Sequence, residues 1–141
     1  MQAQLAWEME GRLIVAVHTR RNPSESEWSR FINTYLSRPR PPDTRVLVVS
    51  YGGAPDAAQR KQLADALKVP APTAIMTASV VLRSLGTAFA FFNRQMKIVG
   101  IDEHDAACRY LGLSQEEAMR VRKLRSSLEQ RLELANQELR A

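Results

Sequence analysis

Two glycines, two hydroxyl-bearing residues and an arginine follow directly after a continuous apolar run. Residues 50–60, SYGGAPDAAQR, follow the run Val46–Val49. Glycines permit a sharp turn, and the amides of such a turn can bind an anion together with an arginine near a helix start. The lysine and following hydroxyl of a phosphate-binding P-loop are absent, so a surface ion pair remains the alternative. The candidate partner- or ligand-binding residues here are Ser50, Tyr51, Gly52, Gly53, Pro55, Gln59 and Arg60.

A second polar group marks the beginning of a later segment. Thr77 ends the short apolar segment 73–77, and Ser79 has the side chain of a helix N-cap. Arg83 then falls in the first turns of a helix predicted over Val80–Phe92. We expect these residues to adjoin the glycine turn, where the second arginine could contact the same anion or the same partner protein.

The residues that most often catalyse reactions are sparse. Neither histidine, His18 or His104, lies near a glycine-flanked serine of the nucleophile-elbow type. Asp102 and Asp105 flank His104, but carboxylates at a helix start are already favoured by the helix dipole. The sequence therefore predicts a protein that is not an enzyme, with no cofactor and no metal site.

Length and composition indicate one folded domain. The chain has 141 residues and 45% hydrophobic content, which is enough for a core and argues against disorder. No apolar run approaches the roughly 20 residues of a membrane span, and no signal-peptide pattern is present. Cys108 is the single cysteine and is interpreted as a small core residue. We expect a cytoplasmic protein without a membrane contact.

The basic charge does not by itself indicate nucleic-acid binding. The net charge is +5, but the arginines are scattered, with denser groups only in residues 38–45 and 120–125. No zinc finger, helix-turn-helix or aromatic RNA-binding signature accompanies them. Solvated basic faces are the preferred interpretation, and nucleic acid is an unfavoured partner.

The N-terminal half predicts a hairpin followed by a helix. Residues 3–10 and 12–19 have the pattern of two strands meeting at Gly11, the first half exposed and the second deeper in a sheet. Ser24 and Glu27 then form a capping-box pattern. The helix that they begin should bury one stripe, made of Trp28, Phe31, Ile32, Tyr35 and Leu36.

Strands and helices alternate through the rest of the chain. The run 46–49 indicates a strand buried on both faces, and Asp56 begins a helix. Further strands are predicted at Thr73–Thr77 and Lys97–Ile101, and Asp102 should cap a helix that Gly112 closes. The order ββαβαβαβα predicts an α/β fold with a mixed five-stranded sheet and crossover helices.

A last amphipathic helix follows. Ser114 and Glu117 form another capping-box pattern, and apolar residues from Ala118 to Leu139 recur every 3.6 positions on average. We interpret residues 1–113 as the domain and 114–141 as a C-terminal helix extension. This helix is expected to supply a face for self-association or docking, which would make the protein a homo-oligomer.

Over residues 4–113 the chain resembles STAS-like domains of the anti-sigma-factor-antagonist (SpoIIAA-like) superfamily, in particular stand-alone bacterial members. The resemblance depends on the order of elements and on four motifs. These are residues 22–28 with Trp28, the GGxPxxxQR turn at 52–60, the stretch from Thr77 through Ser79 to Arg83, and YLGL at 110–113.

This resemblance implies a regulatory protein-interaction module in bacterial signalling, without chemistry of its own. In the signalling branch, a kinase that is also the anti-sigma factor phosphorylates a serine or threonine after the third strand. Here the matching residues 50–53 lack the usual Asp-Ser or Asp-Thr pair, and a satisfied strand-end hydroxyl is the alternative for Ser50. The second hypothesis is a small-ligand, phosphate or nucleotide-binding protein that uses the crevice from Gly52-Gly53 to Arg60.

Overall fold

The computed structural model describes residues 3–38, 41–66, 71–80 and 95–136 of the chain. The helix predicted over Val80–Phe92, including Arg83, lies almost wholly outside these residues. The elements are β1 (Leu5–Glu10), β2 (Leu13–His18), α1 (Glu25–Ser37), β3 (Arg45–Ser50), α2 (Ala57–Ala66), β4 (Thr73–Thr77), β5 (Met96–Val99), α5 (His104–Tyr110) and α6 (Gln115–Asn136).

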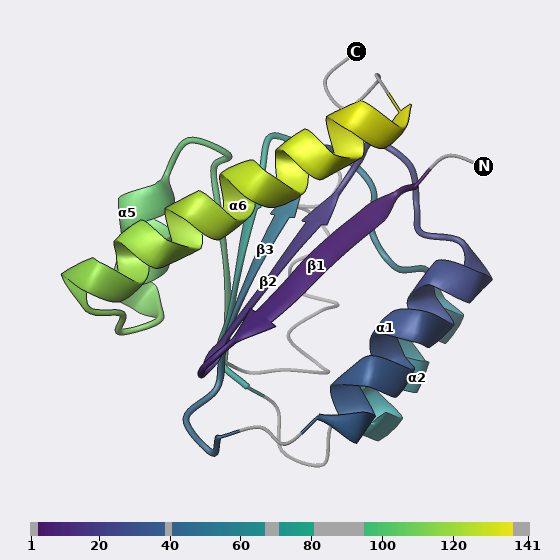
Figure 1. The fold of residues 1–141 in the computed structure, drawn as a ribbon, viewed down its shortest axis with the longest axis horizontal. Helices are drawn as coiled ribbons and strands as arrows, with labels where there is room; N and C mark the ends of the chain where they lie inside the picture. The colour runs from purple at the N-terminus through teal and green to yellow at the C-terminus, as the bar shows by residue number, and fades with distance from the viewer. Residues whose placement is uncertain (1–2, 39–40, 67–70, 81–94, 137–141) are drawn as a thin grey trace.

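The five strands form one mixed sheet in the order β1-β2-β3-β4-β5 (Figure 1). β1 is antiparallel to β2, and each of the other neighbouring pairs is parallel. The expectation of an α/β fold with a five-stranded mixed sheet is therefore confirmed. Because β2 to β5 are parallel, their carboxyl ends meet at one edge, where ligand sites of α/β proteins commonly lie.

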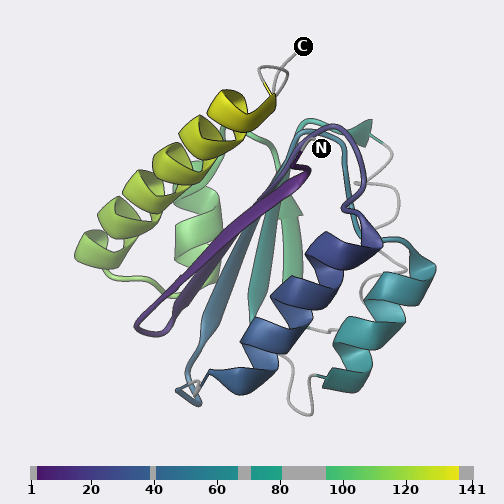
Figure 2. The same ribbon diagram turned by 45° about the vertical axis from the view of Figure 1, so that its right-hand side comes forward.

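Helices cover both faces of the sheet. α1 and α2 lie on one face, and α5 and α6 lie on the other (Figure 2). Side chains alternate along each strand, so Ile14 and Ala16 join the core beneath α1, whereas Val15 and Val17 join the core beneath α6. All six residues of β2 are buried, which agrees with the continuous apolar run of residues 13–17 in its sequence.

The predicted hairpin and the predicted start of the first helix are confirmed, although both strands are shorter than expected. Gly11 has a φ of 57° between β1 and β2. The Ser24 side chain accepts a hydrogen bond from the Glu27 amide, and the Glu27 carboxylate accepts one from the Ser24 amide. Leu36 was wrongly placed in the buried stripe, because its side chain is 53% exposed. Around the helix axis, Leu36 is about a quarter of a turn away from the middle of the buried stripe. Its side chain therefore lies beyond the edge of the contact between the helix and the sheet.

Two predicted boundaries near the fifth strand are also corrected. β5 begins at Met96 and ends at Val99, not at Ile101. The N-cap of α5 is Glu103, not Asp102. The Glu103 carboxylate turns back to accept a hydrogen bond from the Gly100 amide at 2.7 Å, which fixes the turn after the strand instead of capping the helix.

α6 belongs to the same core as the sheet. Val121, Leu128 and Leu132 are at most 1% exposed and pack with Val15 and Val17. The packing therefore joins α6 to the domain, although the sequence suggested an extension beyond residue 113. The apolar face expected to mediate self-association is covered within the chain as far as Leu132. No helix in the described part of the chain is long and apolar enough to cross a membrane.

Candidate functional site

Three polar side chains stand in one row across the carboxyl ends of parallel strands. His18 of β2 pairs in register with Ser50 of β3, which pairs with Thr77 of β4. All three are buried, with exposed fractions of 4%, 1% and 0%. Strand alternation places them on the face that carries α1 and α2. The structure thus brings together two residues singled out in the sequence and a histidine that ends the neighbouring strand.

The hydroxyls of this row hold the turns that follow the strands. Ser50 Oγ donates to the Gly53 carbonyl at 2.5 Å and accepts from the Gly52 amide at 3.1 Å. Thr77 Oγ1 accepts from the Ser79 amide at 3.0 Å. Ser50 is therefore a buried strand-end hydroxyl with partners, and it is not presented to a kinase in this structure.

Tyr51 points to the opposite face of the sheet. Its hydroxyl donates a hydrogen bond to the Glu129 carboxylate of α6. Glu129 also pairs with Arg125 at 3.3 Å between Oε1 and Nε, and Arg125 donates to the Ile101 carbonyl at 3.3 Å. Tyr51 therefore ties α6 to the carboxyl edge of the sheet.

The double glycine joins two loops. A Cβ atom at Gly53 would lie 2.0 Å from the Arg21 carbonyl oxygen, so no larger residue fits without moving a backbone. The Gly53 amide donates to the Thr19 carbonyl at 2.8 Å, and the Ala54 amide donates to Asn22 Oδ1 at 3.0 Å. We name residues 20–22 and 54–58 the joined-loop rim. Residues 20–22 were not identified from the sequence as part of this surface. The signal that could have found them is Gly53 itself, because a glycine can mark the close approach of another backbone segment as well as a turn.

These hydrogen bonds leave the backbone amides of the glycine turn without a free N–H group to bind an anion. The amides of Gly52, Gly53 and Ala54 all donate to acceptors within the chain. Arg60 donates from Nη1 to the Pro55 carbonyl at 2.9 Å, which closes the first turn of α2 on itself. The amides expected to hold a phosphate are therefore already in use.

Gln59 fastens α2 to the rest of the layer. Its side chain is buried, accepts from the Asp56 amide at 2.9 Å and donates to the Pro23 carbonyl at 3.2 Å. The Trp28 indole donates to the Gln59 carbonyl at 3.1 Å. Gln59 thus positions α2 against α1, and its side-chain hydrogen bonds are made within the chain and not to a partner or ligand.

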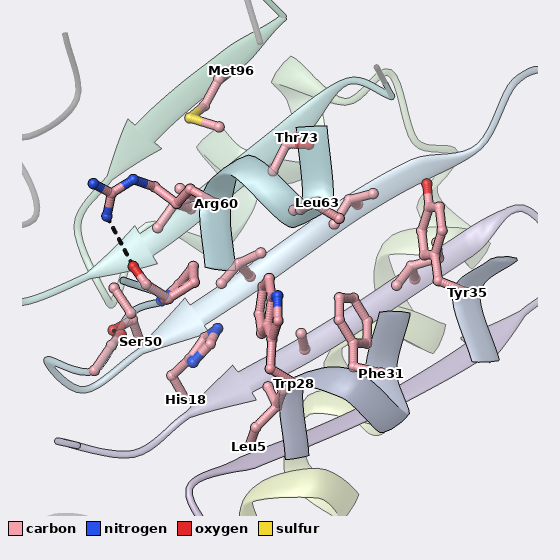
Figure 3. Close-up of a pocket in the computed structure, with 18 of the residues that line it drawn as sticks. Leu5, His18, Trp28, Phe31, Tyr35, Ser50, Arg60, Leu63, Thr73 and Met96 are labelled. Atoms are coloured by element: carbon pink, nitrogen blue, oxygen red, sulfur yellow. Dashed lines mark hydrogen bonds between the residues drawn. The ribbon is translucent and has the colours of Figure 1, made fainter. Parts of the chain in front are cut away.

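A pocket lies between the sheet and the layer of α1 and α2 (Figure 3). Its cavity volume is about 140 Å³. Figure 3 shows His18, Ser50 and Arg60 toward one end of the pocket and Tyr35 toward the other. The described walls are mostly aliphatic and aromatic, and include Leu5, Ile14, Trp28, Phe31, Val48 and Leu63. Sequence patterns do not reveal such a pocket, because it depends on how far a helix layer stands from the sheet.

His18 is the unusual residue of this pocket. Its Nδ1 is buried and has no hydrogen-bond partner in the part of the chain that the structure describes. Burial lowers the pKa of His18 to about 4, and the nearby Glu27 carboxylate opposes this shift without cancelling it. The imidazole is therefore neutral at pH 7, with one ring nitrogen that donates and one that accepts.

The second histidine forms a separate buried pair. His104 Nε2 lies 3.3 Å from Cys108 Sγ and 3.1 Å from the Ala118 carbonyl oxygen. Burial raises the pKa of Cys108 and lowers the pKa of His104, so the thiol stays protonated and is not an activated nucleophile. Among the described residues, no group of three or more His, Cys, Asp or Glu could hold a metal ion.

Comparison with known proteins adds no relative. No family model matches the chain, and no curated protein or solved structure matches it. The class of protein is therefore defined by the architecture alone, an α/β protein with a five-stranded mixed sheet.

Proposed function

We propose that the protein is a non-enzymatic, STAS-like regulatory module that docks a protein partner through the joined-loop rim. The proposal places it in bacterial signalling in the cytoplasm, with a role like that of an anti-sigma-factor antagonist. The observation that carries it is the pair of hydrogen bonds that join the two loops, Gly53 amide to Thr19 carbonyl and Ala54 amide to Asn22 Oδ1.

The rim has the properties of a preorganised docking surface. It follows the carboxyl ends of β2 and β3, where partners and ligands of open α/β sheets commonly bind. Its two halves are hydrogen-bonded to each other, so binding costs little additional ordering of the loops. Residues 20–22 and 56–58 are exposed on it.

The charge of the rim indicates the kind of partner. Arg20 and Arg21 are both exposed and adjacent, and Asp56 is the one acidic residue of the rim. Complementary charge speeds association and excludes wrong partners more than it adds affinity. We therefore expect an acidic protein surface opposite Arg20 and Arg21.

Two features expected from the sequence are not part of this docking surface. Ser50 is 1% exposed, so the proposal includes no phosphorylation at that position. The apolar face of α6 packs on the sheet as far as Leu132, so this part of the helix is not available for self-association.

Co-purification from the native cell with quantitative mass spectrometry tests the proposal. The double variant Arg20→Glu/Arg21→Glu is compared with Arg30→Glu/Arg109→Glu, which makes the same charge change at exposed positions on α1 and α5. Nuclease treatment removes partners bridged by nucleic acid. We expect a protein partner that the control retains and the rim variant loses. Equal recovery of every partner by both variants would contradict the proposal.

A further inference from the structure

We propose that the pocket between the sheet and the α1–α2 layer binds a single-ring molecule that carries one hydroxyl group, phenol being the simplest member of the class. This inference goes beyond the proposed partner docking and does not depend on it.

The size of the cavity sets the size of the ligand. Its volume is about 140 Å³. An apolar cavity of about 150 Å³ in another protein accommodates benzene, so one six-membered ring fits this space. A dinucleotide or a long acyl chain would extend far outside it.

The walls favour an aromatic ring. Trp28 and Phe31 reach from α1 into the pocket, with ring centroids 5.4 Å apart and planes tilted by 48° (Figure 3). Opposite them the sheet contributes aliphatic side chains, including Val48, Ile75 and Ile98. An aromatic ligand would continue the tilted ring contacts of α1 while burying its edges against the aliphatic surface.

His18 supplies the polar contact that fixes the hydroxyl. The side chain is 4% exposed and lines the pocket, and its buried Nδ1 has no partner among the described residues. Nδ1 has almost no accessible surface, so a ligand hydroxyl reaches it only when the imidazole turns toward the cavity. The hydrogen bond then removes the cost of a buried polar atom without a partner. A hydroxyl can donate or accept, so it satisfies the neutral imidazole in either tautomer.

The pocket disfavours an anion of the size of phenol, such as benzoate. The imidazole is neutral, and the amides of the glycine turn donate within the chain. Arg60 is the cation among the described lining residues, and its Nη1 already donates to the Pro55 carbonyl. Moving a carboxylate into apolar walls without matched charge is expensive, so benzoate should bind less well than phenol.

The test compares three probes, phenol, benzene and benzoate, on the full chain at pH 7. Binding is measured by titration calorimetry, and NMR follows the His18 ring and the Trp28 indole. We expect phenol to bind about tenfold more tightly than benzene, the usual effect of one added hydrogen bond. In His18→Leu that preference should disappear while benzene affinity stays within about threefold.

A second variant tests the location without touching the histidine. Ala64 lines the pocket, so Ala64→Leu should fill the cavity and abolish phenol binding. Gln62→Leu places the same leucine side chain at an exposed position of α2, outside the joined-loop rim, and should bind phenol like the wild type. The proposal is overturned if no probe binds saturably, if benzoate binds more tightly than phenol, or if Ala64→Leu binds phenol normally.

Discussion

Gly53 and Arg21 approach so closely that a single methyl group at position 53 would lie 2.0 Å from the Arg21 carbonyl oxygen. Gly53 is not among the glycines with a positive φ, so this contact, and not backbone conformation, requires glycine there. The contact joins the loop after β2 to the loop after β3. The loops after β2 and β3 consequently form one continuous surface at the carboxyl edge of the sheet instead of two independent loops.

Gly53→Ala is therefore expected to separate the loops. The backbone must move, and the hydrogen bond from the Gly53 amide to Thr19 is lost, at a cost of about 1–3 kcal/mol in the free energy of unfolding. Urea denaturation measures this change in the free energy of unfolding. Gly11→Ala is the matched control: nothing lies within 4 Å of its Cβ, so only its φ of 57° opposes alanine. It should cost about 1–2 kcal/mol and leave the rim amides unshifted in NMR spectra, whereas Gly53→Ala should shift them.

His18 makes the stability fall as the solution is acidified. Its folded pKa of about 4 lies below the ordinary value of 6.5, so the unfolded chain takes up the proton first. The stabilisation is complete above pH 6.5 and is lost as pH falls toward 4. We expect a loss of about 2 kcal/mol between pH 7 and pH 5 from this residue.

Denaturation of wild type and His18→Leu at both pH values measures this contribution. His104, whose pKa is also lowered, acts in the same direction in both proteins and cancels in the comparison. The pH dependence should be shallower in His18→Leu by about 2 kcal/mol. Parallel curves for the two proteins would show that His18 is not buried as described.

The ion pair between Arg12 and Glu117 responds to acid in a lower pH range. Hydrogen bonding to Arg12 lowers the pKa of Glu117 to about 2, so its stabilisation is present above the ordinary 4.5 and is lost as pH falls toward 2. Arg12→Ala should cost about 1 kcal/mol at pH 7, after allowance for solvent screening, and should flatten that acid limb. Glu116→Ala removes an exposed pair to Arg120 and should change stability by less than about 0.5 kcal/mol.

The Tyr51 hydroxyl anchors the buried carboxylate of Glu129. Tyr51→Phe removes that donor, and we expect a cost of about 1–3 kcal/mol in thermal or urea unfolding. Tyr110→Phe is the control, because Tyr110 is 38% exposed and should tolerate the change within about 0.5 kcal/mol. A Tyr51→Phe protein as stable as this control would argue against the contact between the sheet edge and α6.

The sequence predicted those features that depend on local chemistry. The hairpin at Gly11 and the capping box of Ser24 and Glu27 require only residues close in the chain, and both are present. The alternation of strands and helices was sufficient for the α/β class. The predictions that Leu36 is buried and that Asp102 caps a helix were wrong. The width of a buried helix stripe and the choice of the N-cap residue both depend on what packs nearby.

Features that depend on distant contacts were missed for the same reason. No local pattern reveals that Asn22 accepts from the Ala54 amide or that Leu128 packs on β2. The pocket likewise depends on the separation between α1 and the sheet.

The central claim is that the joined-loop rim contacts a protein partner, and site-specific photocrosslinking tests it most directly. A photoreactive amino acid is introduced at Arg21 on the rim or at Arg109 on α5, both exposed positions, and the cells are irradiated. We expect a discrete crosslinked protein from position 21 that is absent at position 109. No product at position 21, or the same products at both positions, would contradict the account.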